Sequence, residues 1–137
     1  TKRRKKLPAT FEISDVIPAR PLIVFAAWLD GESHTKMTGG QATGEPAEGA
    51  EFTAWDGYIS GRNVELPPGA LIVQSWRTSQ FDDSDPDSRL EITFEFEGDD
   101  ATRITLTHSN LPDDQAAGYK SGWADHYFES MKKYFGR

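Results

Sequence analysis

The sequence predicts an α+β domain in which a curved antiparallel sheet of about six to seven strands wraps around a long C-terminal helix. The first observation is an aromatic stripe near the C-terminus. Its members recur at steps of four, four, four and three, the spacing of one helix face: Tyr119, Trp123, Tyr127, Met131 and Tyr134. The second is the alternation of apolar and acidic or polar residues over 90–97, which is typical of a half-buried antiparallel strand. The third is a series of turn signals between strand-length segments. A meander of twisted strands curls and can hold one long helix on its concave face.

The N-terminal part of the chain predicts a tail, one strand and two short helices. Residues 1–8 hold the basic run from Lys2 to Lys6, which we expect to be a flexible, solvated tail. Contact with nucleic acid or an acidic partner is the alternative for this run. Residues 9–137 are expected to form a single domain, beginning with a strand over 9–17. Pro21 suits a first helical position, and a second short helix over 30–37 should close at Gly39 and Gly40. The first helix should bury one face that carries Leu22, Phe25, Trp28 and Leu29.

The middle of the chain predicts strands, and its end predicts the long helix. Residues 41–50 indicate a short edge strand and a turn, followed by strands over 52–55, 58–66 and 71–79. Asp56-Gly57 is a strong hairpin signal between the first two of these. In the strand that follows the acidic segment 82–87, the expected buried face carries Leu90, Ile92, Phe94 and Phe96; in the last strand it carries Ile104, Leu106 and His108. Pro112 with Asp113 and Asp114 predicts the helix start, and Gly136 predicts its end.

Composition excludes several classes of function. The net charge is −7 although five basic residues lie in the N-terminal run, and so acidic a body argues against nucleic-acid binding. No apolar run approaches the length of a membrane span, and no signal-peptide pattern is visible at the N-terminus. The absence of cysteine excludes disulfides and fits a cytoplasmic chain.

The aromatic residues have two interpretations. They are plain core, or they are the walls of an apolar cavity between sheet and helix in which a few polar groups orient a guest. Under the second interpretation, the candidate ligand-binding residues are Trp28, Phe52, Trp55, Trp76, Phe94, His108, Trp123 and Tyr127. His108 should point inward by strand parity, where it either contacts a ligand or is a core histidine paired with a backbone group or water.

The remaining polar residues do not indicate a metal or cofactor. His34 and His126 are expected to be partly exposed helix residues, and the three histidines lack the close spacing of a zinc site. The acidic segment 82–87 has oxygen ligands for calcium but lacks the glycine and distal glutamate of an EF-hand loop, so a mobile, solvated loop is the better interpretation. No catalytic triad, phosphate loop or nucleotide fingerprint is present, and we nominate no catalytic residue and no cofactor.

Several segments in this order resemble a known family. They are Asp56-Gly57-Tyr58-Ile59-Ser60-Gly61, Leu66-Pro67 with Ile72-Val73-Gln74-Ser75-Trp76-Arg77, and Gly122-Trp123 with Tyr127-Phe128-Glu129 and Phe135-Gly136. Together they resemble the helix-grip proteins of the START and birch-pollen-allergen-like (SRPBCC) superfamily, most closely the C-terminal domain of the activator of the heat-shock-protein-90 ATPase. The resemblance spans residues 11–136 and implies a helix-grip fold, a monomer or homodimer, and a stress-response setting. The full co-chaperone also carries a separate N-terminal domain, and we expect this chain to correspond to the C-terminal domain alone.

Three functions follow as hypotheses. The favoured one is a binding protein that holds an apolar or aromatic small molecule, such as a lipid or polyketide, between the sheet and the C-terminal helix. The first alternative, which the resemblance implies, is an interaction module with a chaperone partner. The second alternative is a cyclase or hydrolase that uses His108 in the same cavity, although an enzyme is the less favoured class.

Overall fold

The computed structural model describes residues 8–136 as one sheet with helices on one face. The expected tail therefore falls almost entirely outside the described residues, since β1 already begins at Pro8. The strands are β1 (Pro8–Ile17), β2 (Glu51–Ala54), β3 (Ile59–Glu65), β4 (Leu71–Thr78), β5 (Ser88–Glu97) and β6 (Ala101–Pro112). The helices are α1 (Pro21–Leu29), α2 (Gly31–Thr38), α3 (Ala116–Gly122), η1 (Trp123–Phe128) and α4 (Glu129–Phe135).

The six strands pair antiparallel in the order β1-β6-β5-β4-β3-β2. The first strand thus joins the last one, while β2 to β6 follow one another as a meander. Residues 41–50, which were expected to give a short edge strand, contribute only the single bridge between Thr43 and Thr53. The Asp56-Gly57 signal is confirmed, because the turn at this point connects β2 to β3.

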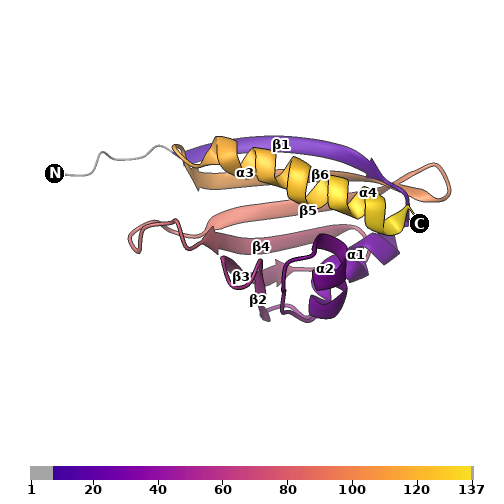
Figure 1. Ribbon diagram of the computed structural model, residues 1–137, viewed down its shortest axis with the longest axis horizontal. Coiled ribbons are helices and arrows are strands. Elements are labelled where there is room, and N and C mark those ends of the chain that lie inside the picture. Colours follow the sequence, from indigo (N-terminus) through magenta and orange to yellow (C-terminus); the bar gives the residue numbers. More distant parts are fainter. Residues whose placement is uncertain (1–7, 137) are drawn as a thin grey trace.

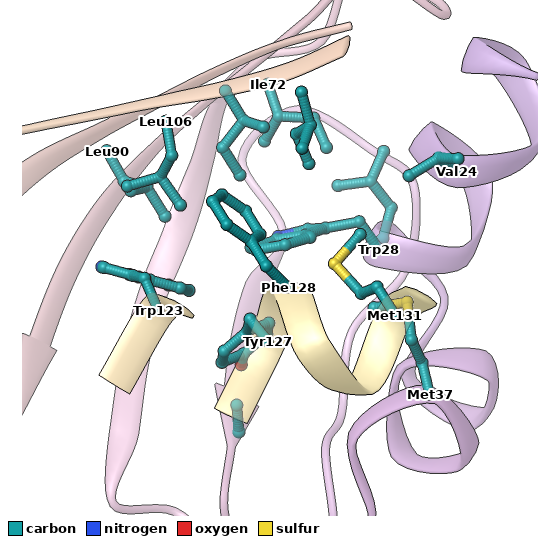
Figure 2. Packing of buried hydrophobic residues seen from close by; sticks show 14 of the residues in the cluster. Val24, Trp28, Met37, Ile72, Leu90, Leu106, Trp123, Tyr127, Phe128 and Met131 are labelled. Atoms are coloured by element: carbon teal, nitrogen blue, oxygen red, sulfur yellow. The ribbon is translucent and has the colours of Figure 1, made fainter. Parts of the chain in front are cut away.

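The C-terminal helical segment lies across one face of the sheet, and α1 and α2 lie at one end of it (Figure 1). Lys132 of α4 fixes this segment to the first strand, with its Nζ 2.8 Å from a carboxylate oxygen of Asp15. Side chains from the helices and the sheet meet in one core, where Trp123, Phe128 and Met131 of the C-terminal segment pack among residues such as Leu106 and Trp28 (Figure 2). The predicted fold class, a curved antiparallel sheet holding a long C-terminal helix, is confirmed.

The C-terminal segment differs from the prediction at its start and in its middle. Pro112 is the last residue of β6, where it pairs with Pro8, so the helix begins only at Ala116 after a turn. The prediction of a start at Pro112 to Asp114 was wrong because strand pairing with β1 continues to that point. The segment is also not uniformly α-helical, since Trp123–Phe128 forms a π-helix. Such wider turns are rare, and they change which side chains share a face.

Two predicted core residues are exposed. Phe96 is 65% exposed although it continues the alternation of Leu90, Ile92 and Phe94, because the β5–β6 hairpin extends past the end of the C-terminal helix (Figure 1). Leu22 is 60% exposed because it lies at the start of α1, beside Gly69, outside the core. None of the helices within residues 8–136 is both long enough and apolar enough to cross a membrane.

Candidate functional site

A pocket of about 390 Å³ lies between the C-terminal helical segment and strands β3 and β4. Six of the ten residues that line it are tryptophan or tyrosine. The lining consists of Trp55, Tyr58, Ile59, Trp76, Gly118, Tyr119, Gly122, Trp123, His126 and Tyr127. Its size lies within the range of about 300–1,000 Å³ that is usual for small-molecule sites, and its walls are mostly apolar.

The pocket has a buried base and an exposed mouth. Trp76, Trp123 and Tyr127 are each almost fully buried and form its inner side. Tyr58, which is 37% exposed, and the exposed His126 lie at the surface. A guest would therefore meet polar tips at the mouth and ring surfaces within.

Two glycines keep the helix side of the pocket open. Gly118 and Gly122 lie four residues apart, and a Cβ atom built on either one has no neighbouring atom within 4 Å. Gly122 has ordinary helical backbone angles, so the fold does not require glycine there for conformational reasons. Glycine inside a helix costs about 1 kcal/mol relative to alanine. The space beside the helix thus coincides with the two positions that carry no side chain.

Trp55 closes the opposite wall in an unusual backbone conformation. It has a φ of +52°, a region that a bulky side chain such as tryptophan rarely adopts, and Asp56 follows with +59°. The indole lies directly against Gly40, where an added Cβ would be 2.3 Å from Trp55 Cε3. The ring also meets His126 edge-on at 5.9 Å. Close packing on both sides holds the strained turn in place.

His108 lies beneath the pocket and is completely buried. The indole N–H of Trp123 donates to its Nδ1 at 3.1 Å, so the ring proton is on Nε2, which donates to Ser88 Oγ at 2.9 Å. The Ser88 hydroxyl in turn donates to the carbonyl of Trp76 at 2.7 Å. Burial lowers the pKa of His108 to about 3. This neutral histidine holds the two tryptophans of the pocket base, and both of its nitrogens are occupied.

His34 holds Tyr127 in a similar way. Its Nδ1 donates to the carbonyl of Trp28 at 2.7 Å, which leaves Nε2 to accept from the Tyr127 hydroxyl at 2.8 Å. The expectation that His34 is partly exposed was wrong, since it is 6% exposed. Burial lowers the pKa of His34 and raises the pKa of Tyr127, so both groups are neutral near pH 7. His126 is exposed, as expected.

Hydroxyl groups at the rim are linked to one another. Tyr119 donates to Gln115 Oε1 at 2.6 Å and shares a hydrogen bond of 2.7 Å with the Thr78 hydroxyl. Partial burial raises the pKa of Tyr119 to about 12. Tyr58 donates to Gln80 Oε1, and the backbone carbonyl of Gln80 accepts from Gln115. These contacts fix the tyrosine rings of the pocket without placing a charge in it.

The structure brings together four of the eight candidate residues, namely Trp55, Trp76, Trp123 and Tyr127. The other four lie outside the pocket lining. Trp28 and Phe52 border a void of about 10 Å³, Phe94 packs edge-on against Phe25 at 5.6 Å in the core, and His108 lies behind Trp123. Sequence reasoning missed Tyr58, Tyr119 and the two glycines. The signal for the glycines was their four-residue spacing, each directly before a residue of the aromatic stripe.

The acidic segment 82–87 is bound by an arginine. The Arg77 guanidinium donates to the carbonyls of Asp82 and Asp85 and to the Asp87 carboxylate, at 2.8–3.2 Å. The segment is therefore tied to β4 rather than simply solvated. Within residues 8–136, no group of three or more His, Cys, Asp and Glu side chains is placed to hold a metal ion.

A family model described as "Activator of Hsp90 ATPase homolog 1-like protein" matches residues 18–136. The chain belongs to this family. The resemblance predicted from its sequence segments is thereby confirmed.

Members and neighbours of the activator family are similar over most of this chain. An activator of 90 kDa heat shock protein ATPase homolog from Dictyostelium discoideum is 25% identical over 135 residues, which are 98% of this chain but 35% of that protein. The chain thus spans about a third of the length of this relative. A crystal structure of an HSP90 activator from Plasmodium falciparum has a TM-score of 0.83 at 24% identity and covers 93% of this chain and 96% of that one. The Aha1 dimer from Colwellia psychrerythraea has a TM-score of 0.71 at 18% identity, with 85% and 88% covered.

All three groups of segments that carried the resemblance contribute residues to the pocket lining, and Trp76 represents the second group. Tyr58 and Ile59 follow the Asp56-Gly57 turn, and Gly122-Trp123 lies where α3 passes into the π-helix. Because these residues are spread over more than sixty positions of the sequence, the pocket exists only in the folded domain.

Proposed function

We propose that this activator homologue binds a small, mainly apolar molecule in the aromatic pocket beside its C-terminal helix. The observation that supports this most directly is the open space at Gly118 and Gly122. An apolar guest that covers these apolar walls removes apolar surface from water. This burial favours binding by about 25 cal/mol per Å² of apolar surface. The rings are already fixed by hydrogen bonds, so binding would require little ordering of the site.

The enzyme hypothesis receives no support from His108. Its nitrogens are engaged by Trp123 and Ser88, and its low pKa leaves it unprotonated at neutral pH. A general acid–base group must reach the proton that it transfers. Binding is therefore the function that the site favours.

Filling the pocket from the helix tests the proposal. Gly122→Leu adds a bulky side chain to a residue of the pocket lining, where a Cβ meets no atom within 4 Å, and replaces glycine by a better helix former. We expect the melting temperature to stay the same or rise while binding of a neutral apolar probe, butylbenzene, is lost. Binding is measured by isothermal titration calorimetry.

Gly122→Ala is the matched control, since it improves the helix to a similar extent but fills little of the pocket. It should bind butylbenzene nearly as the unmodified protein does. Undiminished binding in the leucine variant, or absence of binding in the unmodified protein, would contradict the proposal.

A second candidate is a chaperone-interaction module, and the family membership favours it. The Dictyostelium relative is an Hsp90 ATPase activator homologue of almost three times this length, so the activity of the whole protein is only a proposal for this chain. The chain of the Plasmodium activator is covered almost completely, so it is of similar length to this one. This similarity supports activator function in a chain of this length.

ATP turnover by purified Hsp90 measures this second function. We expect a saturable rise in turnover when this protein is added, with the same stimulation by the Gly122→Leu variant because that change is confined to the pocket. No change in turnover and no co-sedimentation with Hsp90 would exclude it. Light scattering of the same preparation distinguishes the proposed monomer from the proposed homodimer.

A further inference from the structure

The arrangement of the pocket rings restricts the shape of a guest. Trp76 and Tyr119 are inclined at 82° with centroids 5.0 Å apart, Trp76 and Trp123 at 44°, and Trp123 and Tyr127 at 53°. A flat polycyclic guest stacks well only on rings that are nearly parallel. Rings inclined to one another instead surround a compact, rounded group from several sides.

The charges around the pocket restrict the charge of a guest. None of the lining residues is lysine or arginine, and the only basic group among them is the exposed imidazole of His126. The field of the Asp114 carboxylate reaches the Tyr119 hydroxyl and helps to raise its pKa. The chain as a whole carries a net charge of −7. An anionic guest would find no lysine or arginine in the lining, whereas a cation would meet the negative faces of the aromatic rings.

We propose that the aromatic pocket selects an organic cation, specifically a methylated ammonium group attached to an apolar body. Quaternary ammonium groups are rounded, weakly hydrated for a cation, and are attracted to the faces of tryptophan and tyrosine. The buried base formed by Trp76, Trp123 and Tyr127 would receive either the ammonium group or the apolar body. The remaining volume of the pocket would accommodate the other part. This inference rests on the proposed binding function and adds the chemical class of the ligand.

A pair of probes that differ in one atom tests this class. Benzyltrimethylammonium and neopentylbenzene have the same shape, with a nitrogen cation in one where the other has a neutral carbon. A merely apolar pocket binds the neutral probe more tightly, because the cation loses more hydration. A cation-selective aromatic pocket binds benzyltrimethylammonium more tightly, by about fivefold or more. The titration is done by calorimetry at pH 8, where imidazole is generally neutral.

A variant pair assigns the preference to the rings. Tyr58→Leu keeps an apolar side chain at the mouth but removes a π face, so it should weaken binding of the cation several-fold and leave the neutral probe nearly unchanged. Tyr134→Leu removes an aromatic ring outside the pocket lining and should change neither. Gly122→Leu should abolish binding of both probes.

The outcomes separate the two proposals. Tighter binding of the cation, lost selectively in Tyr58→Leu, supports the inference. Equal or tighter binding of neopentylbenzene overturns the cation class while leaving the apolar-ligand function in place. Absence of binding by both probes overturns both proposals.

Discussion

Two buried histidines fix the positions of Trp123 and Tyr127, two of the aromatic side chains at the base of the pocket. Trp123 donates to His108 and Tyr127 donates to His34, so two positions four residues apart on one helix are held by two different elements. Each histidine can accept only because it is neutral, and its tautomer follows from its second partner, Ser88 in one case and the Trp28 carbonyl in the other. Protonation of either ring would convert an acceptor into a donor that faces another donor.

Stability should therefore decline in mild acid. The folded pKa of His108, about 3, lies below its ordinary value of 6.5, so between these values the unfolded chain binds a proton that the folded protein does not. The free energy of unfolding then falls as the pH falls. By linkage, His108 alone should lower it by about 2 kcal/mol at pH 5 relative to pH 7.5. His34, whose pKa is also lowered by burial, acts in the same direction.

Urea denaturation at the two pH values measures this loss. His108→Gln has an oxygen that can accept from Trp123 but no group that titrates in this range, so its loss between pH 7.5 and pH 5 should be clearly smaller than that of the unmodified protein. Identical losses in the two proteins would show that His108 does not carry the acid sensitivity.

At the scale of elements, glycines serve opposite purposes on the two walls of the pocket. Gly40 lets the connection after α2 approach the Trp55 ring closely, and this contact helps to hold the strained turn before β3. Gly118 stands on α3 beside open space. A methyl group added at Gly40 would overlap the Trp55 ring, whereas one added at Gly118 would have no neighbouring atom within 4 Å.

The two alanine substitutions should consequently have opposite signs. Gly40→Ala forces the Trp55 ring to move, and overpacking of this kind costs about 1–3 kcal/mol of unfolding free energy. Gly118→Ala should increase the unfolding free energy by about 0.5–1 kcal/mol through its higher helix propensity. Chemical denaturation of both variants checks the difference. A Gly40→Ala protein as stable as the unmodified one would mean that Trp55 can leave its wall without cost.

The elements were predictable wherever a pattern repeats. The alternation in β5 and the aromatic stripe of the C-terminal segment both predicted the correct element type, because periodicity reflects which face is buried. The residues at which the buried face of a strand ends and at which a helix begins were not predictable. Phe96 continues the alternation but lies beyond the cover of the helices, and Pro112 has the sequence of a helix start but pairs with Pro8. The π-helix over Trp123–Phe128 was not predicted either.

At the scale of the whole molecule, the pocket is a property of how the sheet and the helix meet. The sequence identified the aromatic residues but could not separate Trp28, which is core, from Trp55, which is a wall. That distinction depends on the distance between elements far apart in the chain. His108 was expected to point inward, either toward a ligand or as a core histidine, and strand parity did place it inside the domain. The alternation along the strand could not reveal that the Trp123 indole would lie against His108.

The row of tryptophans in the core gives the molecule an optical signature. Trp28 and Trp123 stack at 5.8 Å with an angle of 28°, and Trp123 lies 5.7 Å from Trp76. Indoles this close and held at fixed angles share their electronic excitations, so the near-ultraviolet circular dichroism of the folded protein should be dominated by the trio. Such signals vanish when packing loosens even if the helices and strands persist. The molecule thus contains a reporter of its own packing and requires no added label.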